Sequence, residues 1–171
     1  VLEDIINGQL TNDFWEITLP LDLATSSSTS PSLYAYYAAQ YVLGANGLFS
    51  KLKVSDLLQE GLRSKKSALE RHHLFPKAWL QRNGVPDQTQ RNQIANYALV
   101  EWSDNINISD NHPKEYLPHY FDRLATHEKE SMYYWHALPQ NWEEMEYEEF
   151  LVQRRKLISQ VVRDAYLKIS S

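Results

Sequence analysis

The sequence predicts a mainly α-helical α+β fold, in which one small two-stranded hairpin is embedded in a helical domain. Apolar residues recur at helical spacing towards the end of the chain, whereas only two short segments, the later part of 68–76 and 97–102, favour strands. The 171 residues, 43% of them hydrophobic and 23% charged, are enough for one well-packed domain. The expected fold class is therefore α+β, mainly helical.

Residues typical of helix starts and stops mark the helical segments. Ser30 followed by Pro31 resembles an N-cap and a first helical turn, which predicts a helix over 32–43. Gly44 and Gly47 then end this helix, because glycine readily adopts the conformations that follow a helix. Further helices are expected over 54–58, 113–124 and 126–136.

The last helix has the clearest pattern. Asn141 with Glu144 three residues later resembles a capping box, which predicts that the helix starts there. Between Phe150 and Ile169 apolar side chains recur at i, i+3 and i+4 spacing, which indicates one buried face. We expect this helix to be scaffold without chemistry of its own.

The two strand candidates define a compact element. The first strand runs into a turn that ends at Pro76, and a loop rich in Gly, Pro, Asp, Gln and Asn follows over 81–93. Behind the second strand, Ser103 can cap a short helix. We therefore expect a strand–strand–helix core over about 68–110.

Domain limits and compartment follow from composition. The polar stretch 24–30 predicts that residues 1–30 are an N-terminal segment and linker, the end of an upstream region, and that 31–171 form the domain. The chain begins at Val1 rather than Met, so we expect a fragment of a longer protein. No apolar stretch is long enough to cross a bilayer and no signal peptide opens the chain, which predicts no membrane partner.

The absence of cysteine excludes disulfides and Cys-type zinc sites and fits a cytoplasmic protein.

Charge is distributed unevenly along the chain. The formal net charge is −5, yet residues 61–91 carry seven basic residues against only Glu70 and Asp87. Residues 143–149 carry five glutamates and no basic residue. A basic patch on an acidic protein attracts phosphate locally without binding nucleic acid indiscriminately, although such runs are also common on solvated surfaces.

The basic region contains residue types that can hydrolyse a phosphodiester. At neutral pH, one imidazole can deprotonate a water while one divalent metal neutralises charge on the leaving oxygen. His72 and His73, followed by Asn96 and Asn105, supply these groups. Neighbouring strand residues point to opposite faces, so the two histidines take different roles, and they converge only at a strand end or bulge.

The motifs resemble those of HNH, or His-Me finger (ββα-metal), nucleases. In that pattern a ligand–His pair precedes a short apolar stretch with proline, and the Asn-to-Asn interval of nine residues between Asn96 and Asn105 matches. More widely, the span from Ser30 to Ile169 is similar to the C-terminal nuclease region of GmrSD-type modification-dependent (type IV) restriction endonucleases. The stretches that carry the two resemblances are 70–76 (ERHHLFP), 96–99 (NYAL) and 103–105 (SDN), and then 30–34 (SPSLY), 48–50 (LFS), 72–77 (HHLFPK), 92–99 (NQIANYAL), 101–105 (EWSDN) and 133–139 (YYWHALP).

The resemblance implies a role for each site residue. His73 would be the general base, His72 and Asn105 the metal ligands, and Asn96 a catalytic-site residue that braces the loop through backbone groups or orients His73. Many relatives have Asp at the position of His72, so this site is less negative and its metal is held partly by substrate and water. Mg²⁺ is the expected ion, with Mn²⁺ or Ni²⁺ as alternatives that tolerate imidazole better. The expected nucleic-acid contacts are Arg71, Lys77, Lys65, Lys66, Arg82 and Arg91.

Together these features predict a metal-dependent DNA endonuclease domain. The resemblance implies that it is the cutting module of a larger restriction or phage-defence enzyme, acting on duplex DNA with or without modified bases. The rest of that polypeptide would carry a nucleotide-hydrolysing module, since no Gly-rich phosphate loop occurs in these residues. Two alternatives stay open: an RNA-cleaving nuclease with the same site, and a non-catalytic nucleic-acid-binding module with a degenerate site.

Overall fold

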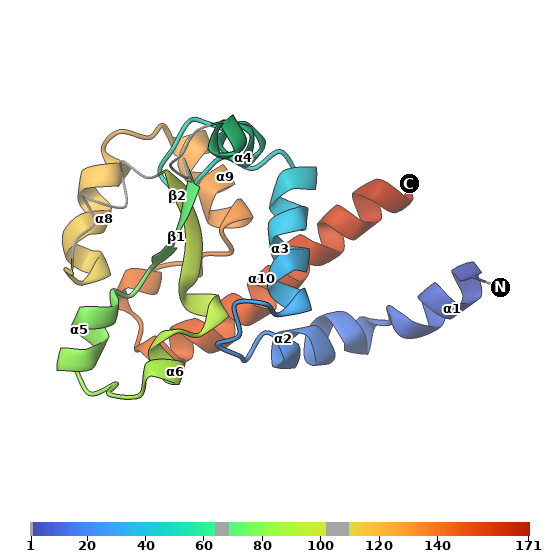
Figure 1. The fold of residues 1–171 in the computed structure, drawn as a ribbon, viewed down its shortest axis with the longest axis horizontal. Helices are drawn as coiled ribbons and strands as arrows, with labels where there is room; N and C mark the ends of the chain where they lie inside the picture. The colour runs from blue at the N-terminus through green and yellow to red at the C-terminus, as the bar shows by residue number, and fades with distance from the viewer. Residues whose placement is uncertain (1, 64–68, 102–109) are drawn as a thin grey trace.

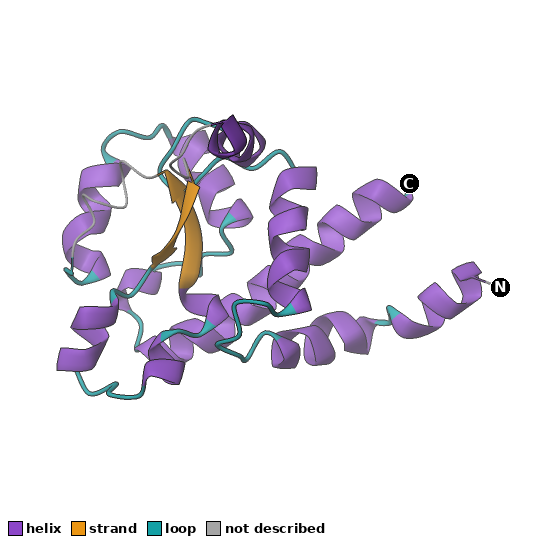
Figure 2. Cartoon of the chain, in the orientation of Figure 1, coloured by secondary structure: helices purple, strands orange, loops and turns teal. Residues whose placement is uncertain are grey.

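Helices surround a single small hairpin. The computed structural model describes residues 2–63, 69–101 and 110–171. Within these ranges the strands β1 (Leu69–His73) and β2 (Tyr97–Glu101) form a two-stranded antiparallel sheet, and most of the remaining chain is helical (Figures 1 and 2). The expected mainly helical α+β fold is confirmed.

The hairpin is regular over its whole length. Leu69 pairs with Glu101 at one end and His73 pairs with Tyr97 at the other. A short parallel bridge adds Leu48 beside Val100, where the Leu48 N–H donates to the carbonyl of Leu99 at 2.8 Å. β2 lies within one residue of its predicted position, and β1 lies inside the segment 68–76 that was expected to contain a strand.

The two faces of the hairpin are covered by different elements. On one face Leu69 and Leu99 are buried against Val54 and Leu57 of α4 (Val54–Arg63). On the other face Ala98 and Val100 belong to the main hydrophobic core. Alternation along the strands produces this division, because successive side chains point to opposite faces.

The N-terminal region is helical and packs on the last helix. It consists of α1 (Leu2–Gln9), the π-helical turn η1 (Phe14–Thr18) and α2 (Leu19–Asp22), and both η1 and α2 pack against α10 (Tyr147–Ser170). Trp15, Leu19 and Leu23 are buried in the main core. Side chains on both sides of residue 30, where the domain boundary is predicted, thus contribute to the same core. The helix α3 (Pro31–Val42) then lies along α10, one residue from its predicted start.

The second half contains α8 (Pro113–Phe121), α9 (Thr126–Trp135), the 3-10 turn η3 (Trp142–Glu144) and α10. The predicted start of the last helix at Asn141 is wrong. Asn141 adopts a left-handed backbone (φ 54°), and α10 begins only at Tyr147. Burial of the Trp142 ring turns the chain here, and a tertiary contact of this kind overrides the local capping signal.

The expected loop over 81–93 contains two short helices near its ends. These are α5 (Lys77–Arg82) and α6 (Gln88–Arg91), followed by the 3-10 turn η2 (Ile94–Asn96) directly before β2. Asp87 caps α6, because its Oδ1 accepts from the Thr89 N–H at 2.7 Å. This segment brings side chains back to the end of β1.

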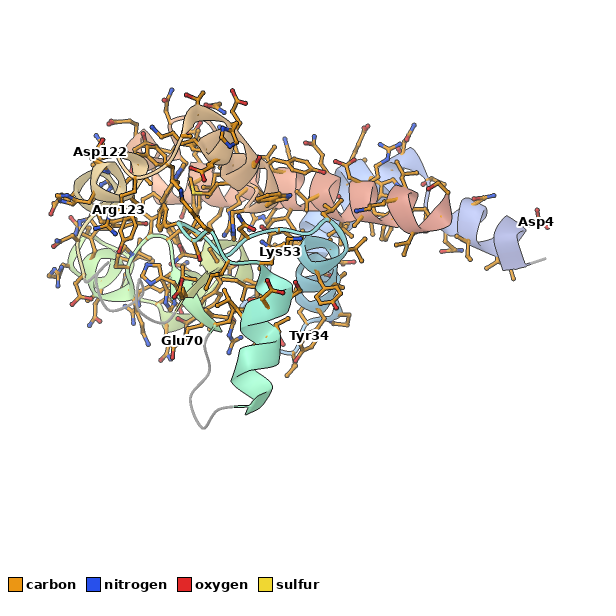
Figure 3. The ribbon with its side chains drawn as sticks, turned by 90° about the horizontal axis from the view of Figure 1, so that it is seen from above. Asp4, Tyr34, Lys53, Glu70, Asp122 and Arg123 are labelled. Carbon is orange, nitrogen blue, oxygen red and sulfur yellow. The ribbon has the colours of Figure 1, made fainter. Side chains whose placement is uncertain are left out.

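The molecule is elongated by its two terminal helices. Figure 3 shows Asp4 on α1 at the opposite end from Asp122 and Arg123, which follow α8. The ends of α1 and α10 project away from the hairpin (Figure 1). Among the described residues, no helix combines the length and apolar character needed to cross a membrane.

Candidate active site

His73 is the last residue of β1 and is half-buried. Its Nε2 lies 3.1 Å from Oδ1 of Asn92, and its ring centroid lies 4.4 Å from that of Tyr97. Burial lowers the pKa of His73 below the ordinary 6.5; the hydrogen bond to Asn92 opposes this, and the charges of Lys77 and Arg71 add to it. A lowered pKa keeps the imidazole neutral at pH 7, as a general base requires.

Asn96 braces the turn that follows His73. Its side chain is fully buried, with Oδ1 accepting from the Phe75 N–H at 2.9 Å and Nδ2 donating to the Phe75 carbonyl at 3.0 Å. The Leu74 N–H also donates to the Asn96 carbonyl at 2.8 Å. The expected bonding of Asn96 to backbone groups is therefore present. No hydrogen bond within the described ranges joins Asn96 to His73, which is contacted by Asn92 instead.

Tyr116 of α8 fixes the same turn from the other side. Its hydroxyl donates to the carbonyl of Leu74 at 2.6 Å, and its ring is edge-on to that of His72 with centroids 6.4 Å apart. Burial raises the pKa of Tyr116 well above 10, so the hydroxyl stays protonated and remains a donor. The turn is thus held on both sides by buried side chains.

His72 lies on the opposite face of β1 from His73. It pairs with Ala98 and is only 7% exposed. The strand is regular through both histidines, with no bulge, and ends at His73. Because β1 ends at His73, the expected division of roles requires a substrate that reaches both faces of the strand at this end.

The second expected metal ligand, Asn105, lies outside the described residues. Within the ranges 2–63, 69–101 and 110–171, no three His, Asp or Glu side chains gather to hold an ion. His72 would supply one imidazole donor, which suits Ni²⁺ better than the harder Mg²⁺ and Mn²⁺, for which oxygen ligands must complete the shell. The donor chemistry therefore fits a metal that depends on substrate and water for the rest of its coordination.

The structure places the basic residues that were expected to contact nucleic acid in three different settings. Arg71 and Lys77 are exposed beside His73, and Arg71 lies over the Tyr97 ring at 5.6 Å. Arg82 is also exposed and donates to the Asp110 carbonyl at 3.2 Å. Lys65 and Lys66 lie outside the described residues.

Arg91, the sixth expected nucleic-acid contact, has its side chain directed into the protein. Arg91 is only 6% exposed, and its Nη1 donates to the carbonyls of Val85 at 3.0 Å and Pro86 at 2.8 Å. Its guanidinium is occupied with the loop before α6, because a buried arginine satisfies several carbonyls at once. It supports the segment that carries Asn92.

Asn92, Tyr97 and Tyr116 were missed as site residues. Asn92 lies in a polar loop, where asparagine is common for turn geometry alone. Only the pairing of β1 with β2 brings Tyr97 beside His73, and only the packing of α8 brings Tyr116 to Leu74. The sequence does place Asn92 four residues before Asn96, but no local sequence rule links this spacing to a site residue.

Comparison of the chain with models of protein families, with curated proteins and with solved structures finds no match. The structural class is therefore defined by the molecule alone: a mainly helical α+β protein with a braced histidine turn at the end of a hairpin. Any function assigned to it depends on the chemistry of these residues.

Proposed function

We propose that this chain is a metal-dependent endonuclease domain that hydrolyses phosphodiester bonds of DNA, with His73 as general base. The observation that supports this most strongly is the setting of His73. Its neutral imidazole is held by Asn92 at the end of a strand, and the exposed cations Arg71 and Lys77 lie beside it. A base next to exposed positive charge suits a reaction at a phosphate.

The braced turn supports the same chemistry. Asn96 and Tyr116 hold the backbone of Leu74 and Phe75, so His73 is presented by a rigid element and not by a flexible loop. Such preorganisation reduces the cost of bringing base, water and phosphorus together. His73 takes a proton from water, and the hydroxide attacks phosphorus while the bond to the leaving sugar oxygen breaks.

His72 and Asn105 are the residues that would hold the metal. When bound, a divalent ion supplies charge stabilisation at the phosphate and the leaving oxygen. An imidazole ligand at the buried His72 would give this ion less charge than a carboxylate would. Mg²⁺ is the proposed ion, with Mn²⁺ and Ni²⁺ as substitutes.

The biological setting follows from the resemblance in the sequence. Similarity to GmrSD-type restriction endonucleases supports a cutting module that acts on duplex DNA, in partnership with a nucleotide-hydrolysing part of a larger polypeptide. Such a role in defence against foreign DNA belongs in the cytoplasm. Phosphate chemistry at His73 suits RNA equally well, so RNA is the alternative substrate.

The test incubates the chain with plasmid DNA and with a long RNA, each in the presence of Mg²⁺, Mn²⁺ or Ni²⁺. We expect cleavage of DNA that His73→Ala lowers by about 10²–10⁴-fold. The matched control is His119→Ala, which removes an exposed histidine from α8. Cleavage of RNA alone selects the alternative substrate, and metal-dependent cleavage that survives His73→Ala overturns the assignment.

A further inference from the structure

The hydrogen bond between His73 and Asn92 determines more than the position of the ring. The Oδ1 of Asn92 is an amide oxygen and can only accept, so the His73 Nε2 at 3.1 Å must carry the proton. In a neutral imidazole the other nitrogen then has a free lone pair. We infer that Asn92 is a positioning residue that holds His73 in its Nε2–H tautomer and assigns Nδ1 as the nitrogen that accepts the water proton.

Asn92 is itself fixed by the structure around it. It is the C-cap of α6, where its N–H donates to the Gln88 carbonyl at 3.0 Å. The neighbouring Arg91 carbonyl accepts from Asn96 Nδ2 at 3.2 Å, and the Tyr147 hydroxyl donates to the Gln90 carbonyl at 2.8 Å. Buried side chains therefore pin the backbone on which Asn92 stands.

The ring of His73 is also fixed against rotation. The Tyr97 ring packs on it at 4.4 Å with an interplanar angle of 48°. Turning the imidazole by half a revolution would place a carbon opposite the Asn92 oxygen and lose the hydrogen bond. The same contact thus selects both the ring orientation and the nitrogen that is left free.

The proton transfer balances with this assignment. A water gives one proton to Nδ1, its oxygen bonds to phosphorus, and the bond from phosphorus to the leaving sugar oxygen breaks. The leaving oxygen takes a proton from solvent, and Nδ1 returns its own proton to solvent. While the ring is charged, the Nε2–H bond to Asn92 becomes charge-assisted and therefore stronger.

The catalytic meaning of this tautomer depends on the proposed function, but the tautomer itself can be measured without any cleavage. Long-range ¹H–¹⁵N NMR correlations of the neutral ring, assigned by their loss in His73→Gln, report which nitrogen carries the proton. We expect the Nε2–H pattern with an Nε2 proton protected from solvent exchange. Asn92→Leu, which keeps the size of the side chain and removes the acceptor, loses that protection, whereas Asn92→Asp keeps it.

The matched control is Asn83→Leu. Asn83 is another C-cap asparagine, exposed at the end of α5, and within the described residues it has no contact with His73. In the nuclease assay we expect Asn92→Leu to lower kcat about tenfold or more with KM nearly unchanged, and Asn92→Asp to restore most of the rate.

The outcomes separate the two proposals. An Nδ1–H pattern, or an Nε2 proton equally protected in Asn92→Leu, overturns the role of Asn92 whether or not the chain cleaves DNA. A protected Nε2–H in a chain that cleaves no nucleic acid overturns the proposed function while the tautomer assignment stands.

Discussion

Arg154 Nη1 donates to the carbonyl of Ala95 at 2.6 Å, one residue before the Asn96 brace. The same fully buried guanidinium donates to the His136 carbonyl through Nε and Nη2, each at 3.1 Å. The last helix is therefore connected directly to the backbone that carries the candidate site, and a residue in α10 can affect the hairpin end without contacting it.

We expect Arg154→Met to destabilise the protein by roughly 2–4 kcal/mol, since buried carbonyls lose their donors. Arg154→Lys should recover only part of this loss, because an ammonium cannot match the planar fork of donors. Urea unfolding followed by circular dichroism measures both. Lys156→Met, at an exposed position of the same helix, is the control and should change stability by less than about 0.5 kcal/mol. Equal effects at the two positions would contradict a special role for Arg154.

The Asn96 brace gives a second stability prediction. Asn96→Ala removes three side-chain hydrogen bonds to the backbone of Phe75 and Arg91 in a fully buried place. The expected loss is roughly 2–4 kcal/mol, measured by urea unfolding. Asn83→Ala, at an exposed position, should cost far less. A mild effect of Asn96→Ala would show that the turn is held without it.

His136 predicts how stability depends on pH. Its Nε2–H donates to the Asn46 carbonyl at 2.9 Å and its Nδ1 faces Gln40 Nε2 at 3.3 Å, so the buried ring is neutral. Burial lowers the pKa of His136 to about 4, with a smaller opposing effect from the Asn46 hydrogen bond. Because the unfolded state takes up the proton first, stability should be complete above pH 6.5 and fall towards pH 4, by roughly 3 kcal/mol in total.

Urea unfolding at intervals between pH 7 and pH 4 measures this dependence. His136→Gln, which cannot titrate, should have a flatter profile, and His119→Gln, at an exposed site, should follow the wild type. Identical slopes for wild type and His136→Gln would contradict the assignment of the neutral ring.

The pH dependence of cleavage tests the surroundings of His73. An unperturbed imidazole would lose its base form below about pH 6.5. Burial and the charges of Lys77 and Arg71 lower the pKa of His73, so activity should persist below that value. Arg71→Gln and Lys77→Gln should each move the acidic limb of kcat/KM towards higher pH, while Lys156→Gln should not. If the acidic limb of kcat/KM stays at the same pH in both variants, Arg71 and Lys77 do not influence the pKa of the base.

The two histidines should respond differently to metal. If His72 is a ligand, His72→Ala should raise the Mn²⁺ concentration needed for half-maximal cleavage, and excess Mn²⁺ should restore part of the rate. Asn105→Ala should behave alike, whereas His73→Ala should stay inactive at every metal concentration. Metal titrations of the three variants measure this difference. If excess Mn²⁺ restores cleavage only in His73→Ala, then His73 is the metal ligand and His72 is the general base.

The sequence predicts the parts of this molecule that local rules control. The ends of β2, α3 and α9 lie within one residue of expectation, since strand alternation, Ser30-Pro31 and helical periodicity act over a few residues. The bonding of Asn96 to backbone was also anticipated. The burial of Arg91, the contact of Asn92 with His73 and the late start of α10 depend on residues distant in the chain, which no local pattern contains.

The N-terminal helices belong to the same structural unit as the hairpin end. Trp15 is buried in the same core as Phe75, and its carbonyl accepts a hydrogen bond from the Ser159 hydroxyl of α10. From α10, Arg154 reaches Ala95 and thus the hairpin end. The hairpin end that carries His73 therefore shares one core with helices that begin well before it in the chain, and we expect that loosening these helices also loosens the position of His73.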